Sequence, residues 1–231
     1  MIYEGEKPGT LSTIEREDVS NGRKVKLKGN GDFRSDECIR FLKEADIVVT
    51  NPPFSLFREY VAQLMEYRKK FVIIGNKNAL TYKEIFPLIK GNKIRLGYEI
   101  PKIFKSPDGT IQNVQGLPRW FTNLDLAKSH EPLSLTEEYN LHPDHYPKYD
   151  NYDAIEVPKV SLIPKDYFGV MGVPITFFDK YCPEQFEVVG ASESEGVGFS
   201  NGLWNETSNV SQPLVRGERT YKRLFIRRRK I

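Results

Sequence analysis

The chain has 231 residues, a hydrophobic content of 39% and a net charge of +3, values typical of a globular protein with a sizeable core. No apolar run approaches the roughly 20 residues that cross a bilayer, and the sequence begins without the pattern of a signal peptide, so neither a membrane protein nor a secreted protein is expected. Two cysteines far apart in the sequence, Cys38 and Cys182, favour a reducing cytoplasm over a disulfide framework.

The first part of the chain predicts a turn followed by one helix. Residues 1–30 are polar and weakly patterned, with a short alternating run at 25–28 that indicates an edge strand. A glycine-rich turn then leads to Asp32 and Phe33. Ser35 is expected to cap a helix, because acidic residues occupy the first turn after it and apolar residues recur on one face.

A short apolar run at 47–50 leads directly into Asn51-Pro52-Pro53-Phe54. The run predicts a buried strand of the kind found in parallel sheets. Two consecutive prolines keep the following backbone extended, so its carbonyls are not taken up by a helix. The Asn51 side chain and the Pro52 carbonyl would then offer two acceptors at the carboxyl end of a strand, where open α/β sheets bind ligands. Such a pair beside an aromatic ring suits a planar base with an exocyclic amino group.

A second strand–loop–helix unit follows the first. The helical pattern that starts at Ser55 leads to an apolar run at 71–74, so a second buried strand, parallel to the first, is expected. Ser55 is expected to cap the first of the two helices. Thr81 and Glu84 have the spacing of a capping box for the second, which should end near residue 90.

Two amides follow the second strand. Because parallel strands end at the same edge of a sheet, Asn76 and Asn78 are expected near Asn51, where they would line a base pocket and bind substrate. Ordinary turn hydrogen bonding explains the same residues equally well.

The rest of the chain predicts short strands with long connections. Strands are expected at 93–98 and 114–123, with a loop or hairpin between them. The segment 125–155 shows little periodicity. Further strand-like runs then alternate with turns, at 160–163, 175–178 and 186–190. The fold class is therefore α/β, with a partial Rossmann-like sheet flanked by helices and an irregular, β-rich C-terminal region.

Basic residues are concentrated at the C-terminus. Residues 216–231 hold eight Lys and Arg against one acid, a charge of +7, so residues 1–215 carry −4 of the net +3. Interleaved apolar residues predict a packed strand that presents arginines, and such a surface is typical of phosphate binding. A solvated tail is the alternative. The substrate-binding candidates are Arg223, Arg227 and Arg228.

The Asn-Pro-Pro-Phe tetrapeptide after an apolar strand resembles the catalytic motif of amino-directed methyltransferases that use S-adenosylmethionine. The wider sequence resembles the EcoRI-type adenine-specific DNA methyltransferase family over roughly residues 28–231. The segments that carry the resemblance are 31–37, 51–60, 75–79, 118–124 and 172–178. The family's amino-terminal part has no counterpart in residues 1–30.

The resemblance implies site-specific methyl transfer from S-adenosylmethionine to N6 of a flipped-out adenine in double-stranded DNA, without a metal. The catalytic residues would be Asn51, Pro52, Pro53 and Phe54. The resemblance also implies that Asp32 accepts hydrogen bonds from the adenine of the cofactor, with Phe33 and Asn51 beside it. A simple turn aspartate is the alternative for Asp32.

The expected organisation is a partial methyltransferase core at 1–124 and a region at 125–231 that completes the sheet and helps to recognise DNA. The missing amino-terminal motifs are explained by truncation, by a partner chain or by an unusual mode of holding the cofactor. The alternative functions are an RNA or protein-glutamine amino methyltransferase, or a catalytically inactive DNA-binding remnant.

Overall fold

The computed structural model describes residue 27 and residues 29–105, 108–114, 116–192, 199–205 and 208–230. The chain divides into two compact units, unit 1 (Met1–Leu124) and unit 2 (Asp125–Ile231). The sequence analysis placed a boundary at the same residues, and the roles expected of the two parts stay predictions. Of the edge strand expected at 25–28 only residue 27 is described, so this strand stays a prediction.

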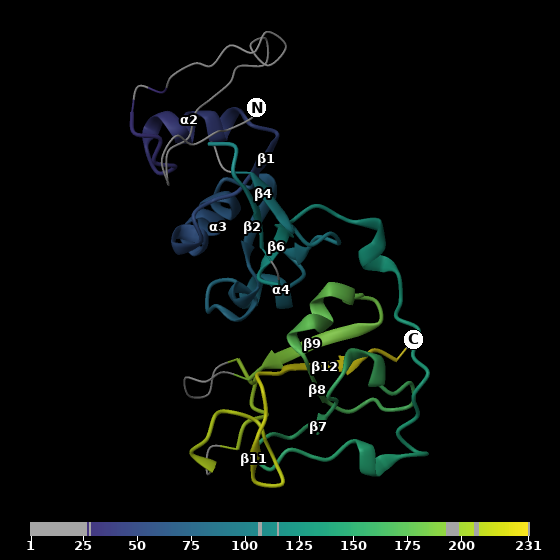
Figure 1. Ribbon diagram of the computed structural model, residues 1–231. Helices are drawn as coiled ribbons and strands as arrows, with labels where there is room; N and C mark the ends of the chain where they lie inside the picture. The colour runs from purple at the N-terminus through teal and green to yellow at the C-terminus, as the bar shows by residue number, and fades with distance from the viewer. Residues whose placement is uncertain are drawn as a thin grey trace. The chain divides into compact units, whose positions relative to one another are not determined.

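Unit 1 is built on a four-stranded mixed sheet (Figure 1). Strands β1 and β2 are parallel, as predicted, and β6 lies antiparallel to both of its neighbours, β2 and β3. The two strands expected at 93–98 and 114–123 are present but shorter. In the order of the sheet, the strands are β1 (Ile47–Thr50), β2 (Lys70–Asn76), β6 (Pro118–Thr122) and β3 (Arg95–Leu96).

Helix α2 (Asp36–Glu44) has the predicted cap. The Ser35 side chain accepts a hydrogen bond from the backbone N–H of Cys38 at 3.3 Å, and two acids follow in the first turn, where the helix dipole favours them. Cys38 and Leu42 form its buried face, and Cys38 and Cys182 are both buried with free thiols.

Helix α3 (Phe57–Glu66) connects β1 to β2 and buries the predicted apolar face, which consists of Phe57, Tyr60, Val61 and Leu64. The expected cap at Ser55 is wrong, because residues Phe54–Leu56 form a 3-10 turn (η1) before the helix. Leu56 N–H donates to the Pro53 carbonyl at 3.0 Å, so Ser55 lies inside this tighter turn rather than at the helix end.

The predicted capping box at Thr81 and Glu84 is also wrong. The chain after β2 forms a 3-10 turn, η2 (Lys77–Thr81), and the Thr81 hydroxyl donates to the Asn78 carbonyl at 3.2 Å. Helix α4 (Phe86–Lys90) begins five residues after Thr81 and ends at Gly91, close to the expected end. The earlier turn forms because an asparagine at the strand end caps it.

Strand β1 is not the fully buried strand that its composition predicted. Ile47 is 46% exposed and Val49 54% exposed, whereas Val48 is buried. The reason is that β1 lies at an edge of the sheet and only its Val48 side is covered, by side chains of α2 and α3. Strand β2 matches its prediction, because Phe71, Ile73 and Ile74 are all buried.

Unit 2 contains a second four-stranded sheet, seen in Figure 1 with its strands side by side. Strand β12 pairs antiparallel with β8 and β9, and β7 is parallel to β8. The strands in order are β7 (Ile155–Glu156), β8 (Met171–Val173), β12 (Leu224–Arg228) and β9 (Phe186–Ala191). The strand expected at 186–190 is thus β9, and the packed strand expected at the basic C-terminus is β12.

Two other strands expected in unit 2 are 3-10 turns, η5 (Val160–Leu162) and η6 (Ile175–Lys180). Pro174 precedes η6 and removes the backbone donor that a central strand needs. The apolar run is still buried, because Phe177 packs edge-on against Phe186 with ring centroids 5.2 Å apart. The described part of the unit also contains two more 3-10 turns, η3 (Ala127–His130) and η4 (Pro143–His145), and the antiparallel pair β10 (Leu214–Val215) and β11 (Glu218–Arg219).

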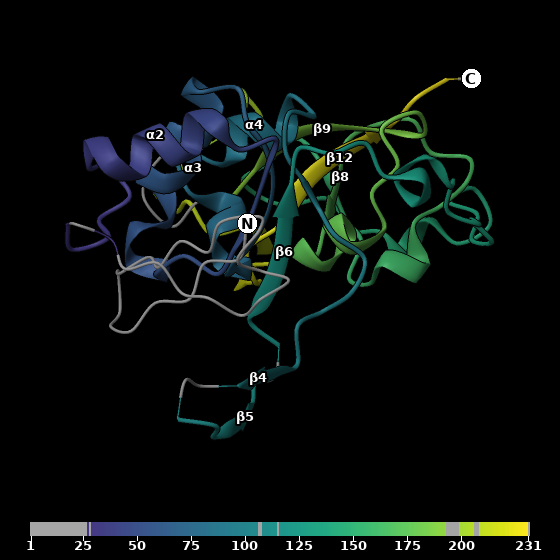
Figure 2. The same ribbon diagram turned by 90° about the horizontal axis from the view of Figure 1, so that it is seen from above.

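The hairpin expected between residues 101 and 109 exists in unit 1 as the antiparallel pair β4 (Ile103–Lys105) and β5 (Ile111–Asn113), which Figure 2 shows as a separate two-stranded ribbon. No helix in the described part of the chain is long and apolar enough to cross a membrane.

Gly75 of β2 is required by close packing. A Cβ atom at this position would lie 2.4 Å from the Phe57 ring and 2.9 Å from the Phe121 ring. We expect Gly75→Ala to lower the free energy of unfolding by about 1–3 kcal/mol, because the two rings must move. Urea denaturation measures this. Gly29→Ala is the control, since its Cβ would meet nothing closer than 3.4 Å; equal losses in both variants would contradict the packing account.

Candidate active site

The proline corner, residues Asn51–Phe54, has a buried proline between two exposed side chains. Pro52 is buried, and Pro53 has an extended backbone with φ −56° and ψ 128°. Asn51 on one side of the prolines is exposed, and Phe54 on the other side is 42% exposed. The prolines therefore anchor the turn while the two flanking side chains face solvent.

The two predicted acceptors are available in this geometry. Among the described residues, neither the Asn51 side chain nor the Pro52 carbonyl has a hydrogen-bond partner. A helix that began at Asn51 would have used the carbonyls of this turn, but the first carbonyl that accepts a helical hydrogen bond is that of Pro53, two residues later. Two oxygens close in the sequence are thus left for an external donor.

Asn76 and the proline corner both follow the carboxyl ends of neighbouring strands, but β2 extends further than β1 before it reaches Asn76. Thr50 pairs with Ile73, so β2 continues for three residues to Asn76, roughly 10 Å of strand. The Asn76 side chain accepts a hydrogen bond from Asn78 N–H at 2.9 Å. This is the turn role that was the alternative in the sequence, and contact of Asn76 or Asn78 with a substrate base stays a prediction.

Asp32 is tied to a neighbour that the sequence did not single out, Arg34. One carboxylate oxygen of Asp32 accepts from the Arg34 backbone N–H at 2.9 Å and from Nε at 3.0 Å, and the other accepts from Nη2 at 2.8 Å. These bonds lower the pKa of Asp32 to about 2. The carboxylate is therefore a permanent acceptor at physiological pH, and it retains lone pairs for a further donor.

The segment that contains Asp32 is fastened to helix α3. Arg34 Nη1 lies 3.1 Å from a carboxylate oxygen of Glu59, Phe33 packs edge-on against Tyr60 at 5.0 Å, and Gln63 donates to the Phe33 carbonyl at 3.1 Å. Because α3 begins directly after the proline corner, its first two turns hold both parts of the predicted site. The spacing Asp-x-Arg before a helix was the available signal for this contact.

A small cavity of about 30 Å³ lies beside Phe33, and the Oε1 atom of Gln63 is buried there without a partner among the described residues. Its size suits about one water molecule and excludes a nucleobase. Its walls are otherwise apolar, formed by Phe33, Cys38, Phe41, Leu42, Val48 and Tyr60. This cavity is therefore not itself a base-binding pocket.

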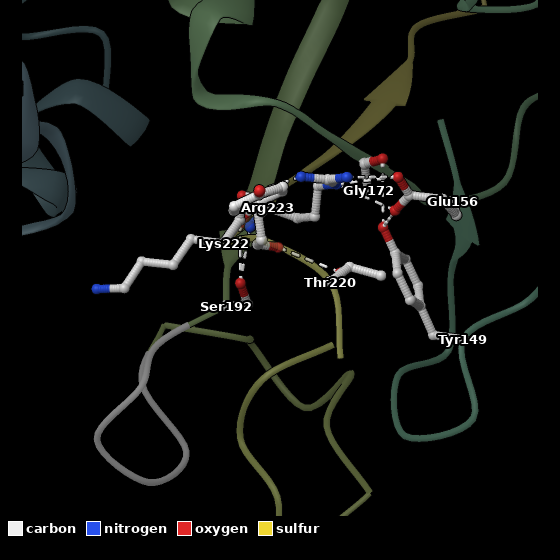
Figure 3. Close-up of polar contacts among 8 residues, drawn as sticks. Tyr149, Glu156, Gly172, Ser192, Thr220, Lys222 and Arg223 are labelled. Carbon is white, nitrogen blue, oxygen red and sulfur yellow. Dashed lines mark hydrogen bonds and ion pairs between the residues drawn. The ribbon is translucent and has the colours of Figure 1, made fainter. Parts of the chain in front are cut away.

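The expectation that Arg223 contacts substrate is wrong, because this side chain is buried in an ion pair with Glu156 (Figure 3). Arg223 Nε lies 3.1 and 3.0 Å from the two carboxylate oxygens, and Nη2 lies 2.6 Å from one of them. The Tyr149 hydroxyl donates to the same carboxylate. Burial is the larger cause that raises the pKa of Tyr149, and the negative charge of Glu156 is the next. An arginine in a charge run looks the same in sequence whether it faces solvent or the interior.

The ion pair spans the sheet of unit 2. Glu156 belongs to β7, Arg223 immediately precedes β12, and β8 lies between them. Gly172 of β8 leaves the required room, since a Cβ atom there would lie 2.2 Å from the Tyr149 hydroxyl oxygen. The pair therefore fixes the start of β12.

The other two predicted arginines remain at the surface. Arg227 is exposed, with Nη1 4.0 Å from a carboxylate oxygen of Glu187 on the neighbouring strand. Arg228 is half-buried beside the Phe168 ring. Within the described ranges, no group of three or more His, Cys, Asp or Glu side chains is placed to hold a metal ion.

Comparison with known proteins gives a consistent result. The sequence model of the family described as adenine-specific methyltransferase EcoRI matches residues 6–229. The type II methyltransferase M.EcoRI of Escherichia coli is 52% identical over 178 residues, 70% of this chain and 55% of that protein. The chain thus spans about half the length of this relative. No solved structure matches the chain.

Two further relatives are matched over more of their length. The type II methyltransferase M.MgeORF184P of Mycoplasma genitalium is 38% identical over 90% of this chain and 72% of that protein. The type II methyltransferase M.MpnI of Mycoplasma pneumoniae is 37% identical over 90% of this chain and 73% of its own.

The ion pair of Asp32 with Arg34 makes a prediction for titration. Because Arg34 lowers the pKa of Asp32 to about 2, Arg34→Gln should raise that pKa toward the ordinary value near 3.9. The stability that the pair contributes is present above pH 4 and is lost as the pH falls toward 2. Carboxyl-carbon NMR measures the titration of Asp32. An unchanged pKa in the variant would contradict the contact, and Arg58→Gln, whose partner is Glu84, is the control.

The buried ion pair predicts a loss of stability. Glu156→Gln leaves the Arg223 charge buried without its partner and should lower the free energy of unfolding by about 3–5 kcal/mol. Glu187→Gln, which removes the same charge from an exposed pair with Arg227, should cost about 1 kcal/mol or less. Urea denaturation followed by tyrosine and tryptophan fluorescence compares the two. Equal losses would contradict the structural role of Glu156.

Proposed function

Because this chain belongs to the family described as adenine-specific methyltransferase EcoRI, we propose that it methylates N6 of adenine at specific sites in double-stranded DNA. The methyl donor is S-adenosylmethionine, and the enzyme is of the restriction-modification type, in which it acts as the modification enzyme. The observation that carries the proposal is the proline corner, with two acceptor oxygens beside an exposed Phe54.

The reaction needs acceptors rather than a strong base. The lone pair of the adenine amino group is delocalised into the ring, so the nitrogen is a poor nucleophile. Hydrogen bonds from that amino group to the Asn51 side chain and the Pro52 carbonyl favour a pyramidal nitrogen and stabilise the positive charge that develops during transfer. Oxygens fixed in advance by two prolines lose little freedom when the base binds.

The target base must leave the duplex to reach this corner. The amino group of a paired adenine is enclosed by base pairing and stacking, and enzymes that react at a base flip it into a pocket. Phe54 is exposed next to the acceptors and supplies a ring on which the flipped base stacks. Arg227 and Arg228, on the surface of unit 2, are the proposed contacts to the DNA phosphates.

The described residues fit one end of the proposed cofactor. Asp32 is an ionised acceptor for the adenine amino group, Phe33 provides a flank for the ring, and Asn51 lies at the start of the corner. S-adenosylmethionine supplies an electrophilic methyl group on its sulfonium. The chain's own contribution is to orient that donor and to hold the accepting amine.

Asn51→Ala should lower the methyl-transfer rate about 100-fold or more, the size of effect that follows when one preorganised polar group facing a transition state is removed. Cofactor affinity should change much less than the rate, because Asp32 and Phe33 supply the proposed contacts with the adenine of the cofactor. Incorporation of labelled methyl groups into unmethylated genomic DNA gives the rate, and isothermal titration gives the affinity. Asn113→Ala in the exposed hairpin is the control. A fully active Asn51→Ala enzyme would refute the assignment.

A further inference from the structure

A groove of about 740 Å³ runs along the end of β12 in unit 2. It is lined by the cationic run Arg227, Arg228, Arg229 and Lys230 and by the segment of residues 167–170. Asp153 and Glu187 are the acids that line it, so the groove carries four positive charges against two negative ones. An excess of cations in a concave surface attracts an anion.

Two of the cations meet at one exposed ring. The Arg228 guanidinium lies 5.0 Å from the Phe168 ring centroid, and the Lys230 ammonium lies 5.9 Å from it. Phe168 is 41% exposed and lines the groove, so its ring is accessible at the surface. The ring attracts each cation, but the two cations repel each other, so an anion between them would be stabilised by both.

Arg228 has a donor to spare. Its Nε atom is buried and has no acceptor among the described residues. Its neighbours differ, because Arg229 Nε donates to the Pro183 carbonyl at 2.8 Å and Arg227 faces Glu187. Among the described residues the Arg228 guanidinium thus has no carboxylate or carbonyl partner, and a phosphate is an anion that matches its planar geometry.

We propose that Phe168, Arg228 and Lys230 form a phosphate-binding site that holds the backbone of the DNA substrate. This inference rests on the proposed function and extends it. Arg228 and Lys230 contact the phosphate, and Phe168 is a positioning residue that keeps both cationic groups together. Four consecutive cationic residues, Arg227 to Lys230, line the groove, which suits a polymer of phosphates better than a single free nucleotide. Contacts of this kind orient the duplex without reading its sequence.

The test measures DNA affinity as a function of salt. Fluorescence anisotropy with a labelled duplex gives the association constant at each salt concentration. The negative slope of its logarithm against log salt concentration should become less steep by about 0.9 for each phosphate that a variant no longer neutralises. We therefore expect the magnitude of the slope to decrease by about 1 in Arg228→Gln and by about 2 in the double variant with Lys230→Gln. The reduction should be equal on methylatable and unrelated duplexes. Arg219→Gln, an exposed arginine of β11 in the same unit, is the matched control and should keep the wild-type slope.

Phe168→Leu separates positioning from charge. This variant retains every cation, yet it should weaken binding because the two groups are no longer held over one ring. A slope in the double variant equal to that of the wild type, or an equal reduction in Arg219→Gln, would overturn the site. Circular dichroism confirms that each variant is folded before it is compared.

Competition identifies the source of the phosphate. AMP and inorganic phosphate at millimolar concentration should displace the duplex only weakly. If either binds the wild type tightly while the salt slope for DNA is unchanged in the double variant, the groove binds a small anion and the DNA assignment is overturned.

The two proposals fail in different ways. A wild-type protein that transfers methyl groups to DNA but shows no change of slope in the double variant contradicts the phosphate site alone. A wild-type protein that binds DNA with the expected slopes yet transfers no methyl group contradicts the enzyme and leaves the site standing. Absence of DNA binding contradicts both.

Discussion

The fixed backbone of Pro52 and Pro53 is the constraint on which the account of unit 1 depends. Without them the chain after β1 would pass straight into α3, and the first carbonyls would be consumed by helical hydrogen bonds. The prolines delay the helix to Phe57, leave the acceptors at Asn51 and Pro52 without partners in the described chain, and expose Phe54. Helix α3 then holds the Asp32 segment through Glu59 and Tyr60. One rigid turn thereby organises both the base-binding and the cofactor-binding candidates.

In unit 2 a packed strand, β12, presents closely spaced cations at its end. Strand β12 buries Leu224, Phe225 and Ile226, so the arginines after them emerge at a defined place. The buried pair of Arg223 with Glu156 fixes the start of the strand and removes one arginine from the surface. Burial therefore divides these basic residues: Arg223 is structural, and Arg227, Arg228, Arg229 and Lys230 line the groove.

The sequence was informative where local chemistry decides the structure. The cap of α2, the apolar face of α3, the parallel pair β1 and β2 and the proline corner all follow from residue types at short spacing. It failed where tertiary context decides. Strand β1 looked buried but lies at an edge, Ser55 and Thr81 looked like caps but sit in 3-10 turns, and Arg223 looked like a surface cation but lies in the core. Phe168 was missed because its partners, Arg228 and Lys230, are distant in the sequence. Arg34 was missed although its partner Asp32 is only two residues away; its second partner, Glu59, is distant in the sequence.

The central claim is that the corner presents oxygens to the amino group of a flipped adenine, and the atom that receives the methyl group tests it most directly. Unmethylated genomic DNA treated with the protein and S-adenosylmethionine can be digested to nucleosides and analysed by mass spectrometry. The account predicts N6-methyladenine as the methylated nucleoside. A methyl group on carbon 5 of cytosine, or transfer to RNA or protein in place of DNA, would contradict it.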